Sequence, residues 1–307
     1  MANITITSLV VHNNTAQYQG GGISAGGASD VSIFNSSIAW NTVIQSCSLT
    51  DGGGAGICAL EEAAVEIVGT AVHHNTAISP WGGGVRLLGQ STFAAANSTI
   101  QYNAARIGGG IAMEPNTSVT DLPLLLSLVT NNSATRGPQL AVDPSSMQFV
   151  GNTTFDYASR AAADEGALSL KLAFVGALGL PSPGVLAAVS LGDMQSLGAN
   201  TSDDTGIVHL LLRVRKPPGR YSVSVRLPEF VNVSSANATL HVRGCVPGEV
   251  APIPDTCEPC LPGFYTLDPA AAVCSGCPGG AECPGGAALV PLPGWWHSTA
   301  TSAQMHR

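Results

Sequence analysis

The first half of the chain consists of short runs in which apolar and polar residues alternate. Clear examples are Val31–Phe34, Val65–Val68 and Thr99–Tyr102. Alternation with a period of two over so short a length is typical of β-strands. The pattern therefore predicts many short strands separated by tight turns.

A glycine-rich motif recurs between these runs and ends each time in an aliphatic residue. The clear copies are Gly20–Ile23, Gly53–Ile57, Gly82–Val85 and Gly108–Ile111, and a weaker copy ends at Leu140. The final residues of successive copies are 34, 28, 26 and 29 residues apart. Repeats of this length indicate a solenoid, in which each unit buries its apolar face against its neighbours. A coil of about 26–30 residues with two or three short strands predicts a parallel β-helix.

An asparagine precedes every glycine cluster. These residues are Asn14, Asn41, Asn75, Asn103 and Asn132. In stacked coils the same position lies above itself in each turn, so the amides are expected to bond in a ladder along the axis. The glycines allow positive φ at tight corners and close stacking of the backbone. The aliphatic residues after them are expected to point inward as one apolar stripe, formed by Ile23, Ile57, Val85 and Ile111.

The combination of Asn-X-Ala with Gly-Gly-(Gly/Ala)-(Ile/Val) resembles the repeat of chlamydial polymorphic outer-membrane proteins. It is also similar to right-handed β-helix proteins of the pectin-lyase-like type, over residues 3–155. The phenylalanine that usually precedes the asparagine in the chlamydial pattern is replaced here by other residues. The resemblance implies that residues 1–157 fold as a right-handed parallel β-helix.

Residues 158–243 lose the glycine repeat but keep strand-like stretches. These stretches are 167–175, 185–191, 206–215, 219–227 and 237–242. Turn signals such as Pro181–Gly184 and Pro217–Gly219 separate them. Several short strands with regular turn signals predict a small β-sandwich. The run Pro218–Val225 resembles a late hairpin strand of an immunoglobulin-like module, which implies an immunoglobulin-like β-sandwich.

Six of the eight cysteines lie in residues 244–298, among many prolines and glycines. They are Cys245, Cys257, Cys260, Cys274, Cys277 and Cys283. Two Cys-X-X-Cys pairs among them, with thirteen residues in between, approach a zinc-ribbon spacing. Disulfides are the preferred interpretation, because the segment is poor in apolar residues and the sequons described below favour an oxidising compartment. Fifteen pairings are possible, and the sequence does not choose among them.

The stretches Cys257–Tyr265 and Cys274–Cys283 resemble the ephrin-receptor-like cysteine-rich module. Pro291–Trp296 fits the version common in large surface proteins of algae and protists. The resemblance implies an extracellular, disulfide-rich module with little regular structure over residues 244–298, followed by a tail at 299–307. In the solenoid, Cys47 and Cys58 flank an insertion and are expected to form a further disulfide.

The composition fits thin stacked β layers, since only 10% of the 307 residues are charged and 5% are aromatic. The net charge is −8 and neither end of the chain is basic, which argues against a nucleic-acid partner. Residues 167–191 are apolar, but Pro181–Gly184 breaks them into pieces too short to span a membrane. The sequence shows no secretory leader. The chain is therefore expected to be a fragment of a larger protein, with any membrane contact made by regions absent from it.

Ten Asn-X-Ser/Thr sequons are spread over the chain. The candidate glycosylation sites are Asn3, Asn13, Asn35, Asn97, Asn116, Asn131, Asn152, Asn200, Asn232 and Asn237. Their number favours passage through a secretory pathway and an extracellular or cell-surface location. The alternative is a bacterial or cytosolic solenoid whose sequons arose by chance.

No catalytic set can be assembled from the charged residues of the solenoid. Acids such as Asp30, Glu66 and Glu114 fall on different coil positions, whereas polysaccharide cleavage needs paired carboxylates or a carboxylate-bound metal with a base. His74 stands where other coils carry Asn, Trp or Tyr, so it is expected to stack with its neighbours. No catalytic residue, cofactor or metal is therefore expected.

The sequence thus predicts a non-enzymatic scaffold or adhesion segment whose partner is an extracellular protein or polysaccharide. The alternative is a carbohydrate-active β-helix enzyme, a polyuronide lyase or hydrolase, with an unrecognised site. A basic hairpin around Arg213 and Arg215 could bind anionic glycans, although a solvated hairpin face is the simpler explanation.

Overall fold

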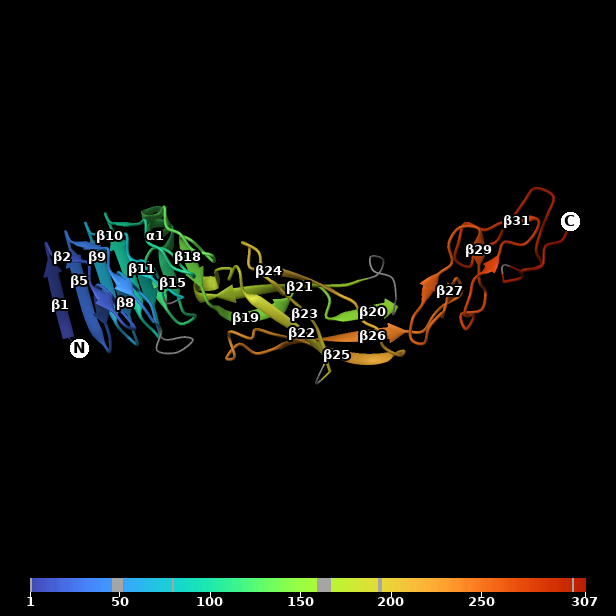
Figure 1. Ribbon diagram of the computed structural model, residues 1–307, viewed down its shortest axis with the longest axis horizontal. Coiled ribbons are helices and arrows are strands. Elements are labelled where there is room, and N and C mark those ends of the chain that lie inside the picture. Colours follow the sequence, from blue (N-terminus) through green and yellow to red (C-terminus); the bar gives the residue numbers. More distant parts are fainter. Residues whose placement is uncertain (1, 46–51, 79, 159–166, 193–194, 300) are drawn as a thin grey trace.

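The computed structural model describes residues 2–45, 52–78, 80–158, 167–192, 195–299 and 301–307. Figure 1 shows an elongated all-β molecule in which three regions follow one another along one long axis. A stacked solenoid leads into a region of two sheets, and the chain ends in small hairpins. The predicted fold class is confirmed.

The solenoid repeats the same strands in the same order. The first coil holds β1 (Ala2–Thr7), β2 (Val10–His12), β3 (Thr15–Ala16) and β4 (Ile23–Ala25). The second holds β5 (Ser29–Phe34), β6 (Ser37–Ala39), β7 (Thr42–Val43) and β8 (Ile57–Ala59). The third holds β9 (Ala64–Val68), β10 (Ala71–His73), β11 (Thr76–Ala77) and β12 (Val85–Leu87).

The last two coils keep most of this order. The fourth holds β13 (Thr92–Ala96), β14 (Thr99–Gln101) and β15 (Ile111–Met113). The fifth holds β16 (Ser118–Val119), helix α1 (Leu122–Leu128), β17 (Val129–Thr130) and β18 (Leu140–Val142).

Equivalent strands of successive coils pair in parallel and form long sheets along the solenoid axis. The strand orders are β1-β5-β9-β13-β16, β2-β6-β10-β14-β17 and β4-β8-β12-β15-β18, with a shorter sheet β3-β7-β11. The register is kept from coil to coil, so that Ile57 lies between Ile23 and Val85. The parallel β-helix predicted from the repeat is confirmed.

The predicted apolar stripe lines the interior of the solenoid. Ile57, Val85 and Ile111 lie in register and are fully buried. They pack against inward residues of the other long sheets, such as Ile33 and Ile38, in one continuous core. Burying a side chain of this size contributes about 1.5–3 kcal/mol. Because these contacts join neighbouring coils, each coil depends on the next for most of its apolar burial.

The glycine cluster turns the chain into the sheet that contains β12. Gly82 and Gly108, the first residues of their clusters, have φ of 67° and 65°, which glycine adopts without steric strain. Gly84 has a different role, since a Cβ atom there would lie 2.6 Å from the carbonyl oxygen of Gly110 in the next coil. The motif thus combines a corner that needs positive φ with a contact too close for a side chain.

The asparagine ladder runs through the interior beside the stripe. Nδ2 of Asn41 donates to Oδ1 of Asn75 over 3.0 Å, and Nδ2 of Asn75 donates to Oδ1 of Asn103 over 2.9 Å. Asn14 and Asn132 extend the series in both directions. The central amides also accept from a backbone N–H and donate to a carbonyl of the previous coil. The predicted ladder is confirmed, and it satisfies the hydrogen-bonding groups of the buried amides.

Helix α1 has no counterpart among the predicted strands. Asp121 caps it by accepting from the N–H of Leu124 over 3.0 Å, and a proline stands in its first turn. Leu125 is buried in the solenoid core, and the helix packs on β13, β14 and β17. The helix therefore covers part of the interior at the last coil.

The second region is a sandwich of two sheets. One contains β19 (Pro144–Phe149), β21 (Leu168–Gly176) and β24 (Ile207–Leu212) in that order. The other contains, in order, β20 (Thr154–Ala158), β26 (Ala236–Arg243), β25 (Gly219–Arg226), β22 (Leu186–Leu191) and β23 (Gln195–Thr201). A 3₁₀ turn, η1 (Ala177–Gly179), follows β21. Inward residues of both sheets, such as Leu170 and Leu240, share one buried core.

The strand order is that of an immunoglobulin-like module. Taken in sequence, the strands form an A-B-E sheet and a G-F-C sheet extended by C′. The first strand is divided, because β20 crosses over and pairs in parallel with β26. Tyr221, near the start of the F strand, donates its hydroxyl to the carbonyl of Pro217 over 2.9 Å, as in the tyrosine corner of such modules. The predicted immunoglobulin-like sandwich is confirmed.

The strand pairing shows that the sandwich begins nearer the N-terminus than predicted. The sequence analysis assigns residues up to 157 to the solenoid, whereas β19 pairs with β21 and β20 pairs with β26. Residues 144–157 therefore belong to the second region, and β18 is the last described strand that pairs with a strand of a neighbouring coil. Alternation alone does not separate these cases, since a strand of either region buries one face. Strand β23 is likewise absent from the predicted stretches.

The last region consists of two-stranded hairpins. They pair β27 (Glu249–Val250) with β28 (Glu258–Pro259), β29 (Phe264–Tyr265) with β30 (Ser275–Gly276), and β31 (Ala281–Glu282) with β32 (Val290–Pro291). Disulfides join Cys245 to Cys257, Cys260 to Cys274, and Cys277 to Cys283. The expectation of disulfides in this region is confirmed. Each Cys-X-X-Cys motif gives its two cysteines to different bridges, so the zinc-ribbon alternative is wrong.

Candidate functional site

The acids that the sequence analysis considered for catalysis lie on separate parts of the solenoid. Asp30 and Glu66 are exposed on β5 and β9, and Asp121 caps α1. Glu114 is the exception, because it approaches an arginine that also binds Asp143. This arginine is the most unusual residue of the solenoid.

Arg86 lies in the middle of β12 and is only 1% exposed. Its neighbours Val85 and Leu87 point into the core, so the Arg86 side chain lies on the outer face of the sheet, in register with Cys58 and Ala112. The segments that precede the glycine clusters fold over this face and add a small second core around Trp81. The Trp81 ring stacks on the guanidinium, 5.3 Å from Cζ to the ring centroid.

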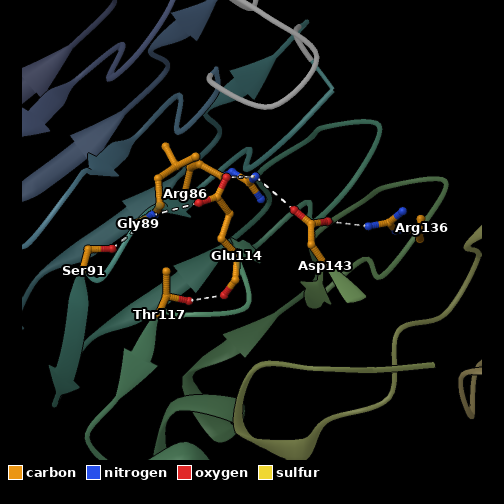
Figure 2. Close-up of polar contacts among 8 residues, drawn as sticks. Arg86, Gly89, Ser91, Glu114, Thr117, Arg136 and Asp143 are labelled. Carbon is orange, nitrogen blue, oxygen red and sulfur yellow. Dashed lines mark hydrogen bonds and ion pairs between the residues drawn. The ribbon is translucent and has the colours of Figure 1, made fainter. Parts of the chain in front are cut away.

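Arg86 belongs to an ion cluster that also contains Glu114, Arg136 and Asp143. Figure 2 shows Arg86 and Arg136 on opposite sides of Asp143. Nη2 of Arg86 donates to Oδ2 of Asp143 over 3.1 Å, and Nη2 of Arg136 donates to Oδ1 over 2.7 Å. Oε1 of Glu114 lies 3.7 Å from Nη2 of Arg86, while its Oε2 accepts from the N–H of Gly89 over 2.9 Å. Two arginines thus face two carboxylates from three successive coils.

The ion cluster has a structural role, because it joins the third, fourth and fifth coils. Both oxygens of Asp143 are bonded to arginines, and the residue is 6% exposed. A general acid or base must reach the substrate, and this carboxylate is closed to it. Burial lowers the pKa of Arg136 below its usual range, against the opposing effect of Asp143 and Glu229. A pairing of this kind holds two buried charges that would be costly alone.

The ion cluster also lies at the joint between the solenoid and the sandwich. The guanidinium of Arg136 lies over the ring of Phe230, in the loop between β25 and β26, at 5.5 Å. Ala177 and Leu180, from the turn after β21, pack on the last coil and extend the solenoid core. The sandwich therefore covers the C-terminal end of the β-helix with apolar contacts and a cation–π contact.

An ion pair lies at the joint between the sandwich and the cysteine-rich region. Nη1 and Nη2 of Arg243, at the end of β26, donate to the two carboxylate oxygens of Glu249 over 2.7 and 2.8 Å. The hydrogen bonds to Glu249 raise the pKa of Arg243. Arg215, from the predicted basic hairpin, donates to the carbonyl of Pro254 over 3.3 Å. This member of the hairpin thus contacts the next region of the chain.

An exposed column of rings forms the second notable site, on the outside of the solenoid. The ring column consists of Trp40, His74 and Tyr102, one from each of three coils. Their centroids are 4.4 Å and 5.2 Å apart, with nearly parallel planes. Trp40 and Tyr102 are 51% and 54% exposed. The stacking expected for His74 is confirmed.

The ring column sits at a corner where the backbone is left-handed. Trp40, His74 and Tyr102 have φ of 58°, 55° and 54°, and Asn13 and Asn131 continue the same position with 58° and 56°. Asparagine and histidine are enriched in this conformation, whereas bulky residues are outliers in it. Holding tryptophan or tyrosine there costs about 1–3 kcal/mol, and such strain tends to occur at binding sites.

The sequon asparagines are all exposed, as attachment of a glycan requires. Asn13, Asn35, Asn97 and Asn131 have φ between 46° and 58°, so these four stand at left-handed corners where asparagine is favoured. The coil itself therefore explains part of the high sequon count. Glycan attachment stays a prediction at all ten positions.

Only one of the two cysteines of the predicted solenoid disulfide lies within the described residues. Cys58 is fully buried on β8, in register with Arg86. Cys47 lies outside the described residues, so the bridge stays a prediction.

Comparison with known proteins supports the solenoid. Residues 2–154 match the family model of the right handed beta helix region. A search of curated proteins finds no match to the chain. The family match and the parallel sheets together support a right-handed beta helix over the solenoid, and the matched range also includes β19, which pairs with β21 of the sandwich.

Proposed function

We propose that the chain is a non-enzymatic segment of an extracellular or cell-surface protein, in which it acts as a scaffold for adhesion or ligand display. Its partner on this proposal is an extracellular protein or polysaccharide. A net charge of −8 offers little to neutralise phosphates, so nucleic acid is not the partner proposed.

The compartment is proposed from the cysteines and the surface. Three disulfides are typical of proteins from oxidising environments. Ten exposed sequons and the resemblance of the last region to ephrin-receptor-like modules support the same location. Among the described residues, no helix is long and apolar enough to cross a membrane.

The observation that carries the proposal is the use of charged side chains at the joints. Asp143 joins Arg86 of the third coil to Arg136 of the fifth coil beside the sandwich. Arg243 and Glu249 join the sandwich to the cysteine-rich region. Buried or bidentate ion pairs fix geometry more firmly than exposed ones. The chain is thus suited to hold its ends at a set distance, as an adhesion rod must do.

The test compares binding with turnover on the same samples. The oxidised chain is incubated with polyuronides and neutral polysaccharides, and new reducing ends and unsaturated products are measured over time. In parallel, the immobilised chain is offered the same polysaccharides and a panel of extracellular matrix proteins. We expect saturable binding to at least one of them without any product. Heat-unfolded chain is the control for both assays.

Product formation that tracks the concentration of folded chain would overturn the proposal in favour of the carbohydrate-active alternative. Absence of both binding and turnover across the panel would also count against an adhesion role. The two failures are distinct, since the first gives products and the second gives none.

A further inference from the structure

Two neighbouring histidines meet on the outer surface of the solenoid. Adjacent residues of a strand normally point to opposite faces. His73 ends β10, and His74 follows it at the left-handed corner with φ of 55°, so the two rings converge. Their Nδ1 atoms lie 2.9 Å apart, with one nitrogen donating to the other.

The separation of these nitrogens matches that of two ligands on one metal ion. Two imidazole nitrogens about 2.0–2.1 Å from an ion lie about 2.9 Å apart at a right angle and about 3.3 Å apart at a tetrahedral angle. Right angles are typical of the tetragonal sites of copper(II) and nickel(II), whereas zinc prefers a tetrahedron. The His73 and His74 rings are 86° apart, so they can occupy neighbouring positions without overlap.

Both rings are held in place before any ion binds. His74 is stacked between Trp40 and Tyr102, at 4.4 Å and 5.2 Å between centroids. Nε2 of His73 lies 3.4 Å from Oγ of Ser37, on the neighbouring strand β6. Fixing the orientation of a ligand ring through its other contacts strengthens metal binding. The strained corner occupied by Trp40 and Tyr102 thus acquires a role, because it builds the stack that orients His74.

The surroundings of the two rings also bear on the binding of an ion. Burial, followed by the neighbouring His74 and His12, lowers the pKa of His73 below its usual value. An imidazole binds a metal through an unprotonated nitrogen, so an ion bound to both Nδ1 atoms would take the place of the hydrogen bond between them. Within the described residues, no third His, Cys, Asp or Glu joins the pair in a metal cage. The remaining positions on the ion would therefore be filled by water.

We propose that His73 and His74 form a binding site for copper(II), with their Nδ1 atoms as neighbouring ligands. Copper(II) is the favoured ion because it has the highest affinity for nitrogen ligands among the first-row divalent metals and accepts this angle. The site is independent of the proposed scaffold role, since it uses only the outer surface of the second to fourth coils.

The experiment titrates copper(II) alone into the oxidised full chain, following heat by calorimetry and tryptophan fluorescence. We expect one tight site per chain and quenching of Trp40, whose ring lies 4.4 Å from His74. Electron paramagnetic resonance of the one-to-one complex should show coupling to two imidazole nitrogens. A Trp40→Phe variant should lose this quenching and keep the binding heat, which separates Trp40 from the other three tryptophans.

The substitutions use residues that the protein itself carries at equivalent positions. His74→Asn copies Asn13 and Asn131, and His73→Gln copies Gln101, which pairs in register with His73. Each should weaken copper(II) binding at least about tenfold with an unchanged circular dichroism spectrum.

Variants of two histidines outside the pair serve as controls. His209→Asn and His306→Asn should leave the tight site intact, because both histidines lie outside the solenoid. Unchanged affinity in His74→Asn would overturn the proposal, as would zinc binding at this pair more tightly than copper(II).

Discussion

The solenoid and the cysteine-rich region solve the same problem in different ways, since neither encloses a thick apolar core. In the solenoid, side-chain amides bond to one another from Asn14 to Asn132, and each coil covers the next. In the cysteine-rich region, the buried hydrophobic residues are few, and most of them are cysteines: Val250, Cys257, Cys260, Cys283 and Leu289. A thin interior is closed by repetition in one region and by covalent bonds in the other. Damage should therefore spread along the solenoid but stay local near the C-terminus.

The largest effect is expected from Asp143→Ala. Removing this carboxylate leaves Arg86 and Arg136 buried without their main partner, which should lower the free energy of unfolding by about 3–5 kcal/mol. Chemical denaturation followed by circular dichroism measures the loss. Asp121→Ala, which removes an exposed helix cap, is the control and should cost about 1 kcal/mol. Equal losses of unfolding free energy in the two variants would show that the ion cluster does not stabilise the joined coils.

Asn75→Ala should break the ladder at its centre. The substitution removes the Oδ1 atom that accepts from Asn41 and leaves buried donors without an acceptor, at a cost of about 3 kcal/mol. Hydrogen exchange should speed up in the coils on both sides, because each coil depends on its neighbours. Asn14→Ala, at the exposed end of the ladder, should have a clearly smaller effect. A response confined to the third coil would contradict the coupled behaviour assigned to the solenoid.

Replacing both Cys260 and Cys274 by serine should show whether damage in the cysteine-rich region stays local. A loop of this size contributes about 3 kcal/mol through its disulfide. Hydrogen exchange should rise around β28 to β31 and stay unchanged in the solenoid. The shorter loop closed by Cys277 and Cys283 should lose less when its disulfide is removed. Faster exchange in the coils would show that the regions are coupled more strongly than their separate cores suggest.

Tyr221→Phe is expected to give the smallest effect. The change removes one hydrogen bond, to the carbonyl of Pro217, and should cost about 1 kcal/mol within the sandwich. Thermal unfolding followed by near-ultraviolet circular dichroism measures it. Tyr102→Phe, on the exposed ring column, is the matched control and should change stability less. An equal loss of stability at both positions would show that the hydrogen bond of the tyrosine corner does not stabilise the sandwich.

The repeat explains why the solenoid could be predicted in detail. The asparagine ladder and the aliphatic stripe follow from one rule, that a stacked position meets itself in the next coil. The same rule identifies His74 as a stacking residue. The rule could not predict helix α1, because Leu122–Leu128 departs from the repeat and has its own cap at Asp121.

The ion cluster and the disulfide pairing could not be predicted from the sequence, for a different reason. Arg86 and Asp143 are 57 residues apart, and the other coils carry no charge at the repeat position of Arg86. Glu114 shares the repeat position of Asp143, but a single recurrence of an acid does not reveal the buried arginines that face it. Nothing in the spacing of the six C-terminal cysteines selects one of their fifteen pairings. The convergence of His73 and His74 needed the left-handed corner, which Asn13 and Asn131 in the equivalent position indicate once the coils are aligned.

The ion cluster sets a rule for how the length of this protein can change in evolution. Each added coil would move the sandwich by about 4.8 Å, the spacing of neighbouring strands. A duplication between the first and second coils would lengthen the molecule and leave every ion pair intact. A duplication after β12 would separate Arg86 from Asp143 and leave buried charges unpaired. Natural variants of different length should therefore differ on the N-terminal side of Arg86.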